Sequence, residues 1–165
     1  MTISLHKLIA AVTVATGVAS CGITGSRGNG DDNYFSAFTA FPRGEWEYAS
    51  PSEFRVDTLR DSISRGGTLI LSMRHTSGYE YSNIWLELSY PVNDSTVKAD
   101  TFNILLADDY GHWLGRGLGP SVQITDTLSR DFTIRKGETI TLRHIMRTDT
   151  LSNIEQVGIV FLPQN

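Results

Sequence analysis

Apolar residues recur at every second position in short runs along most of this chain. In the run 68–73, for example, Leu69, Leu71 and Met73 fall on one face. Alternation over several residues is the pattern of a half-buried β-strand. Similar alternation is found at 84–90, 102–106 and 139–146. The run 157–162 is nearly continuously apolar, so it predicts a central strand covered on both faces.

Turn-forming residues separate these runs, at 65–67, 91–94, 108–111 and 136–137. Glycine, proline, asparagine and aspartate interrupt strands and form tight turns. A helix-length segment with a period of 3.6 residues is not evident beyond the N-terminal leader. The sequence therefore predicts an all-β fold, an antiparallel β-sandwich of the jelly-roll kind with about seven to nine strands. An open barrel is the second possibility.

The N-terminus reads as a bacterial lipoprotein signal. Lys7 precedes the apolar stretch 8–18, and small residues lead directly to Cys21, the only cysteine of the chain. A cysteine in that place receives a diacylglycerol and becomes the N-terminus of the mature protein after residues 1–20 are removed. The stretch 8–18 is too short to span a membrane. The alternative is a buried free cysteine in a cytosolic domain.

Removal of the leader leaves 145 of the 165 residues, the size of one domain. Because Lys7 is the only charged residue of the leader, the net charge changes from −4 to −5, which argues against a nucleic-acid partner. Residues 22–33 are glycine-rich and polar, so we expect 21–33 to be the acylated cysteine and a flexible tether. Residues 34–165 then form a single β-sandwich domain.

Few residues offer catalytic or metal-binding chemistry. With Cys21 acylated, no thiol remains for a disulfide or a zinc site. Asp108, Asp109 and His112 could supply metal ligands or a hydrolytic centre, but Asp-Asp-x-Gly is also common turn chemistry, which we favour. We expect no catalytic residue, no metal and no cofactor. His144 is predicted to lie in the core, and His75 to be exposed at a strand end.

The glycine-dense segment 115–119 does not match a nucleotide-binding loop and reads as a bulge or bend.

Aromatic residues are the other potential binding groups. Trp85 is opposite in phase to Ile84 and Leu86, which predicts an outward side chain unless the sheet is covered on both faces. Exposed rings on a sandwich stack on sugars or anchor a protein partner. The aromatics in question are Trp46, Tyr48, Tyr79, Tyr81, Trp85 and Trp113.

The segment 108–119 is long for a plain hairpin and contains residue types that suit the centre of an interface. Its candidate partner-binding residues, together with Trp85, are Asp108, His112, Trp113 and Arg116. The alternative, which we favour, is that Trp113 plugs the end of the sandwich while the glycines permit tight turns.

Three segments of the chain resemble a known family: 79–86, 106–117, and 145–147 followed by 154–159. Together with the lipoprotein leader and the early aromatic segment 41–46, they look like the GldH gliding-motility lipoproteins of the Bacteroidetes. The resemblance covers nearly all of the mature chain. Glu80 stands where the family often has a proline, which affects the rigidity of that loop.

The resemblance implies a non-enzymatic lipoprotein, anchored through lipid on Cys21, with protein partners in the gliding and type IX secretion apparatus of the cell envelope. It implies no cofactor and gives no reason to expect a small-molecule ligand. Attachment facing the periplasm is the default expectation. The alternative is a surface glycan-binding β-sandwich lipoprotein, and a hydrolase or metal enzyme around Asp108, Asp109 and His112 is the third hypothesis.

Overall fold

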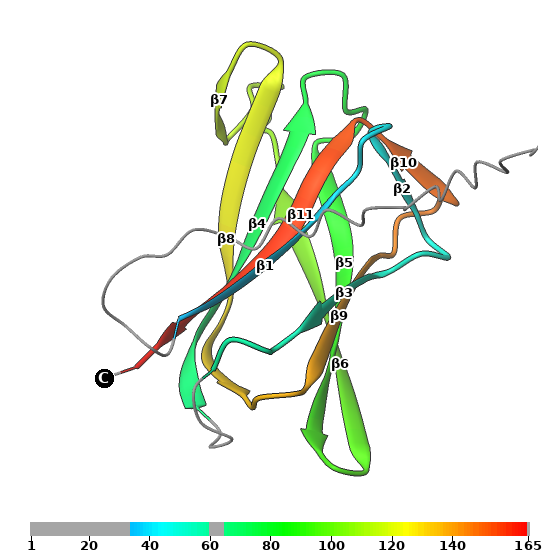
Figure 1. Ribbon diagram of the computed structural model, residues 1–165. Coiled ribbons are helices and arrows are strands. Elements are labelled where there is room, and N and C mark those ends of the chain that lie inside the picture. Colours follow the sequence, from blue (N-terminus) through cyan, green and yellow to red (C-terminus); the bar gives the residue numbers. More distant parts are fainter. Residues whose placement is uncertain (1–33, 60–64, 165) are drawn as a thin grey trace, which may run out of the picture.

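The computed structural model describes residues 34–59 and 65–164, and these residues form an antiparallel β-sandwich (Figure 1). The leader 1–20, Cys21 and the tether to residue 33 lie outside the described residues. Eleven strands and no helix occur in the part that is described. Four strands have only three or four residues, which accounts for the excess over the expected seven to nine. The all-β prediction is confirmed.

The larger sheet has five strands in the order β1-β11-β4-β8-β7. All neighbours are antiparallel, and two register shifts between β4 and β8 mark bulges near Leu69. The strands are β1 (Phe35–Ala40), β4 (Arg65–Thr76), β7 (Arg116–Leu118), β8 (Ser121–Ile134) and β11 (Ile154–Pro163).

The opposite sheet has four strands in the order β3-β9-β5-β6, and a two-stranded sheet pairs β10 with β2. These strands are β2 (Glu45–Glu47), β3 (Ser52–Arg55), β5 (Asn83–Asn93), β6 (Thr96–Leu105), β9 (Thr139–His144) and β10 (Thr150–Ser152).

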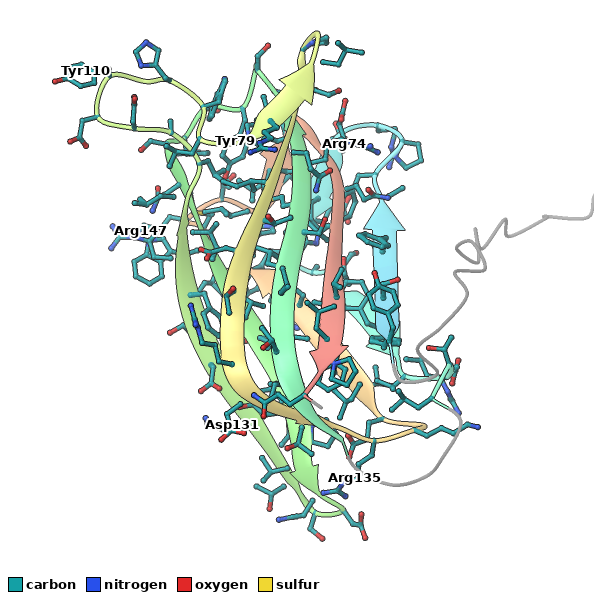
Figure 2. The ribbon with its side chains drawn as sticks, turned by 90° about the vertical axis from the view of Figure 1, so that its left-hand side faces the viewer. Arg74, Tyr79, Tyr110, Asp131, Arg135 and Arg147 are labelled. Atoms are coloured by element: carbon teal, nitrogen blue, oxygen red, sulfur yellow. The ribbon has the colours of Figure 1, made fainter. Side chains whose placement is uncertain are left out.

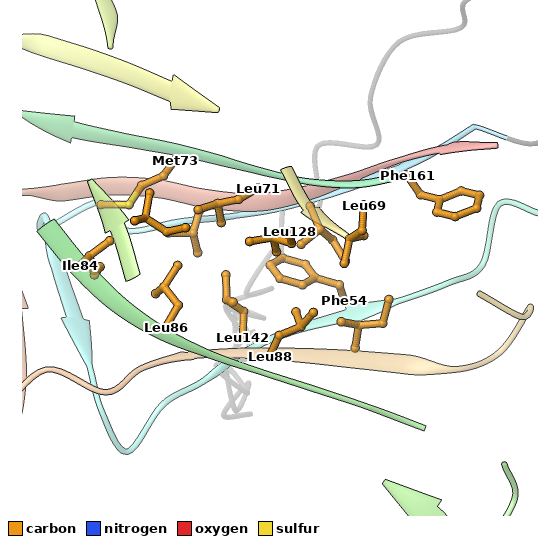
Figure 3. Packing of buried hydrophobic residues seen from close by; sticks show 14 of the residues in the cluster. Phe54, Leu69, Leu71, Met73, Ile84, Leu86, Leu88, Leu128, Leu142 and Phe161 are labelled. Atoms are coloured by element: carbon orange, nitrogen blue, oxygen red, sulfur yellow. The ribbon is translucent and has the colours of Figure 1, made fainter. Parts of the chain in front are cut away.

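The core lies between the two sheets, where the alternation predicts it. Leu69, Leu71 and Met73 of β4 are fully buried. They face a layer contributed by β5 and β9 that includes Leu86 and Leu142, as Figure 3 shows. Each aliphatic side chain removed from water contributes about 1.5–3 kcal/mol, so this layered contact is the main stabilising feature.

Strand β11 is central in its sheet, between β1 and β4, as expected for 157–162. The expectation that both of its faces are covered is wrong. Leu162 on the outer face is 41% exposed, and Val160 is only half-buried. The outer face is partly covered at Gly158, where the ring of Phe38 from β1 occupies the space that a Cβ atom needs.

The sandwich has two distinct ends. β11 pairs Ile154 with His75 at one end and Pro163 with Gly67 at the other. β1 begins with Phe35 opposite Phe161, so the first described strand starts at the Gly67 end. At about 3.3 Å per residue, the other end lies about 30 Å away along β4. We call the Gly67 end the proximal end and the end beyond His75 the distal end.

Candidate functional site

The distal end consists of the connections 77–82 and 106–120. It forms there because β4 ends at Thr76, β5 begins at Asn83, β6 ends at Leu105 and β8 begins at Ser121. Figure 2 shows Tyr110 at the tip of a loop that projects from this end. The loop contains three of the residues proposed from the sequence for partner binding, Asp108, His112 and Trp113.

Asp108 holds this loop in a closed turn. Its Oδ1 accepts hydrogen bonds from the backbone N–H groups of Tyr110 at 2.9 Å and His112 at 2.8 Å. Its Oδ2 lies 3.1 Å from Nδ1 of His112. Gly111 adopts a φ of 83°, the left-handed conformation that favours glycine. These bonds, with that of the His112 backbone first, lower the pKa of the Asp108 carboxyl.

The preferred interpretation of Asp-Asp-x-Gly as turn chemistry is therefore confirmed. Both oxygens of Asp108 already have partners within the turn. No group of three or more potential metal-ligating side chains occurs among the described residues. The arrangement offers an exposed loop tip held by the hydrogen bonds of Asp108.

Trp113 closes the base of the loop. Ala107 and Trp113 form an isolated antiparallel bridge, and the half-buried indole packs on the hydrophobic core. Its ring meets the imidazole of His75 edge-on at 4.6 Å between centroids. Trp113 therefore acts as a plug at the end of the sandwich, as the favoured alternative predicts.

The expectation that His75 is exposed is wrong, because its side chain is fully buried. β4 continues to Thr76, so the alternation of Leu71 and Met73 places His75 on the inward face. Nδ1 lies 2.8 Å from the carbonyl oxygen of Thr76, so it donates to that oxygen. Nε2 is buried without a partner in the described part of the chain. Burial lowers the pKa of His75.

Arg116 and its glycine neighbours form β7, a short strand at the edge of the larger sheet. Arg116 is exposed and pairs in register with Gln123. A Cβ atom on Gly117 would collide with the carbonyl oxygen of Ser121, so the close approach of β7 to β8 requires glycine. The bend predicted for 115–119 is thus a tight pairing of two strands.

Trp85 is 43% exposed on the outer face of the four-stranded sheet, as its phase predicts. It pairs with Asn103, and Leu105 lies two residues further along β6, a diagonal neighbour on the same face. Leu105 is 57% exposed. The structure therefore sets Trp85 beside the distal end rather than within the loop that holds Asp108.

The sequence analysis missed the most exposed apolar side chains of this end. Leu118 is 93% exposed at the end of β7, and Tyr110 is 88% exposed at the loop tip. Leu114 is also exposed, and its N–H donates to the carbonyl oxygen of Leu106. The only signal in the sequence was the clustering of apolar residues within a turn-rich segment.

Six of the twelve exposed large apolar residues among those described lie at or beside the distal end. They are Tyr81, Trp85, Leu105, Tyr110, Leu114 and Leu118. A platform of exposed tryptophans is not found, because Trp46 is fully buried and Trp113 is half-buried.

No helix suited to crossing a bilayer, by length and hydropathy, is found within residues 34–59 and 65–164. No curated protein matches the sequence. Several solved structures are similar in shape. The Eiger TNF of S. frugiperda has 10% identity and a TM-score of 0.40, with 81% of this chain and 95% of that chain covered.

Two other similar structures have lower scores. That of Cocksfoot mottle virus has 12% identity and a TM-score of 0.29, with 99% of this chain and 97% of that chain covered. That of dimeric latent PorU from Porphyromonas gingivalis has 11% identity and a TM-score of 0.31, with 85% of this chain and 14% of that chain covered.

The family comparison agrees with the resemblance in the sequence. The GldH lipoprotein family matches residues 33–161, which is most of the chain. The family consists of accessory lipoproteins associated with gliding motility and anchored to a membrane of the cell envelope, and it is not a known enzyme family. This chain belongs to the GldH lipoprotein family.

Proposed function

We propose that the chain is a non-enzymatic, membrane-tethered adaptor that binds a protein of the gliding or type IX secretion apparatus through its distal end. In this proposal residues 1–20 are removed, Cys21 carries the lipid, 22–33 form the tether and 34–165 form one domain. The body faces the periplasm.

The observation that carries the proposal is the gathering of exposed apolar side chains at one end. Single exposed apolar residues are scattered over the surface of most proteins, whereas a group of them marks an interaction surface. Aromatic and arginine side chains are enriched at the centres of protein interfaces. Tyr110 and Arg116, both exposed, supply these types within one segment of the sequence.

The placement of the start of β1 and of the exposed apolar residues at opposite ends of the sandwich supports the same proposal. β1 starts at the proximal end, and the exposed apolar residues lie about 30 Å away along the strands. A lipid anchor at one end and a binding surface at the other leave that surface free to meet a partner away from the bilayer.

The geometry of the loop supports a preorganised surface. The three contacts of Asp108 fix the turn that carries Tyr110, and Trp113 anchors its base on His75. A partner then meets a loop that is already ordered, which reduces the entropy cost of binding.

The proposal is tested with the full-length lipoprotein in cells of its source organism. A double variant, Tyr110→Ser with Leu118→Ser, removes exposed apolar groups without touching the core. Val97→Ser is the matched control, because Val97 is exposed on β6 far from the loop. Affinity purification followed by mass spectrometry should recover gliding or secretion proteins with the native chain and the control, and lose them with the double variant. Equal recovery from all three would contradict the proposal.

A further inference from the structure

A groove of about 780 Å³ opens between the two sheets toward the proximal end. It lies where β6 and the second half of β8 are the edges of their sheets. β7 pairs with β8 only at Ser121–Gln123, so beyond that point the edge of β8 that faces away from β4 has no partner strand among the described residues. The volume falls within the range of ligand-binding pockets. Figure 2 shows Asp131 and Arg135, two residues that line it, at the end opposite Tyr110.

The floor of the groove is apolar and aromatic. Leu88, Phe102 and Leu128 contribute to its lining. The ring of Tyr90 meets that of Phe132 edge-on at 4.7 Å between centroids. Leu88, Leu128 and Phe132 lie buried beneath the groove, so the half-buried rings of Tyr90 and Phe102 form the apolar surface that the C–H groups of a ligand can reach.

One wall carries a network of hydrogen-bonding groups directed inward. Asp100 accepts a hydrogen bond from the Tyr90 hydroxyl at 2.6 Å and another from Nζ of Lys98 at 3.0 Å. These bonds, with that of Tyr90 first, lower the pKa of Asp100, so the carboxylate stays ionised and has further acceptor capacity. Lys98 in turn has N–H groups left to donate.

The other wall is also polar, and the guanidinium of Arg135 is paired there. Arg135 donates to the carbonyl oxygen of Val92 at 2.9 Å and lies 3.6 Å from Glu138. The lining contains the cations Lys98 and Arg135 and the carboxylates of Asp100, Asp131 and Glu138. With three carboxylates against two cations, the groove has no excess positive charge to attract a phosphate or sulfate.

We propose that this groove binds a neutral oligosaccharide. A pyranose ring presents an apolar C–H face to an aromatic floor, and its hydroxyls both donate to carboxylates and accept from ammonium groups. A lipid acyl chain would leave the charged walls desolvated, which is unfavourable.

An extended peptide is the other occupant that two sheet edges could take. The edge strand β6 opposes this, because Lys98 and Asp100 share its inward face with Phe102 and Ile104. Inward-pointing charges on an edge strand are a feature that hinders the addition of another strand. The chemistry therefore favours the saccharide.

The site lies at the opposite end from the proposed partner surface, so the two proposals fail independently. The test uses the full-length lipoprotein in detergent micelles and a panel of neutral tetrasaccharides of the cello-, malto-, manno-, xylo- and N-acetylchito- series. A heparin-derived oligosaccharide is the anionic comparison, and binding is measured by titration calorimetry.

We expect at least one neutral tetrasaccharide to bind and the heparin fragment not to bind. Asp100→Asn should weaken binding about tenfold, because a hydrogen bond to a charged acceptor is among the stronger ones. Lys98→Met should act in the same direction. Asp109→Asn removes the same charge at the distal end, and Leu118→Ser changes the partner surface; both should bind like the native protein.

Hydrogen exchange locates the bound sugar independently of these variants. Protection should appear in β6 and residues 128–135, and not in 106–120. Silence of the whole neutral panel with folded protein would overturn the proposal. Preferred binding of the heparin fragment would also overturn it, as would an affinity that neither Asp100→Asn nor Lys98→Met changes. A third contradicting result is that an extended peptide from a random library protects the groove and no sugar does.

Discussion

Trp113 stands edge-on against the buried imidazole of His75, with 4.6 Å between the ring centroids. This contact joins the exposed distal loop to the core, because His75 belongs to β4 and Trp113 to the loop that carries Tyr110. His75 also contacts Tyr79, with 5.6 Å between the ring centroids. The base of the proposed binding surface therefore packs on a histidine whose pKa is lowered by burial.

The first prediction concerns acid stability. Burial lowers the pKa of both His75 and His144, so the folded protein keeps them neutral below the ordinary histidine value of 6.5. The unfolded chain takes up these protons first, so stability should fall as the pH drops below about 6.5, by up to about 1.4 kcal/mol per pH unit for each histidine. Urea unfolding at a series of pH values measures this.

The control for acid stability is a variant in which both histidines are replaced, His75→Phe with His144→Leu. His144 is buried against the rings of Trp46 and Tyr48, so an apolar replacement suits its surroundings. The decline between about pH 6.5 and 5 should become shallower in this variant. Identical slopes for variant and native protein would refute the assignment to these two residues.

A pair of adjacent glycines tests the packing at the proximal end. A Cβ atom on Gly67 would collide with the carbonyl oxygen of Leu162 and the ring of Phe161, whereas one on Gly66 would meet nothing within 4 Å. Gly67→Ala should therefore lower the free energy of unfolding by about 1–3 kcal/mol. Gly66→Ala should change it by less than about 0.5 kcal/mol. Equal effects in chemical denaturation would show that the close approach is absent.

The distal turn gives a prediction about local order. Asp108→Ala removes an acceptor of two backbone N–H groups, while the neighbouring Asp109 makes no hydrogen bond within the described part of the chain. Hydrogen exchange of residues 108–113 should become faster by about tenfold in Asp108→Ala. Asp109→Ala should leave it unchanged, and acceleration in both variants would argue that the loss of charge, rather than of the turn, is responsible.

The anchor gives a prediction about localisation. Cys21→Ser removes the only thiol that can carry lipid. The variant should move from the membrane fraction to the soluble fraction of the cell envelope, because exposed β-sandwich surface alone gives no stable anchor. Fractionation followed by immunoblotting measures this. Membrane retention of the Cys21→Ser protein in high salt would contradict anchoring through Cys21.

The fold class could be read from the sequence because alternation is a local property of each strand. The runs at 68–73, 84–90 and 139–146 correspond to β4, β5 and β9. The 14-residue strand β8 was not recognised, because bulges opposite Leu69 interrupt its alternation between Asp126 and Phe132. Extending the alternation of β4 by two residues would have shown that His75 faces inward.

The site was only partly accessible from the sequence. The turn at Asp108 follows from local hydrogen bonding, and Trp85 from its phase in β5. The exposure of Leu118 and the groove beside Asp100 depend on where two sheets end relative to each other. Those are tertiary relationships, and no spacing of residue types within a single strand encodes them.

The most direct test of the central claim is photo-crosslinking in living cells of the source organism. A photoreactive phenylalanine analogue is placed at Tyr110 or Leu118 on the distal end, and at Leu162 on the outer face of β11 as an exposed control. The account predicts crosslinks to a gliding or type IX secretion protein from the two distal positions and not from the control. Crosslinks to such a protein from Leu162 alone, or from none of the three positions, would contradict it.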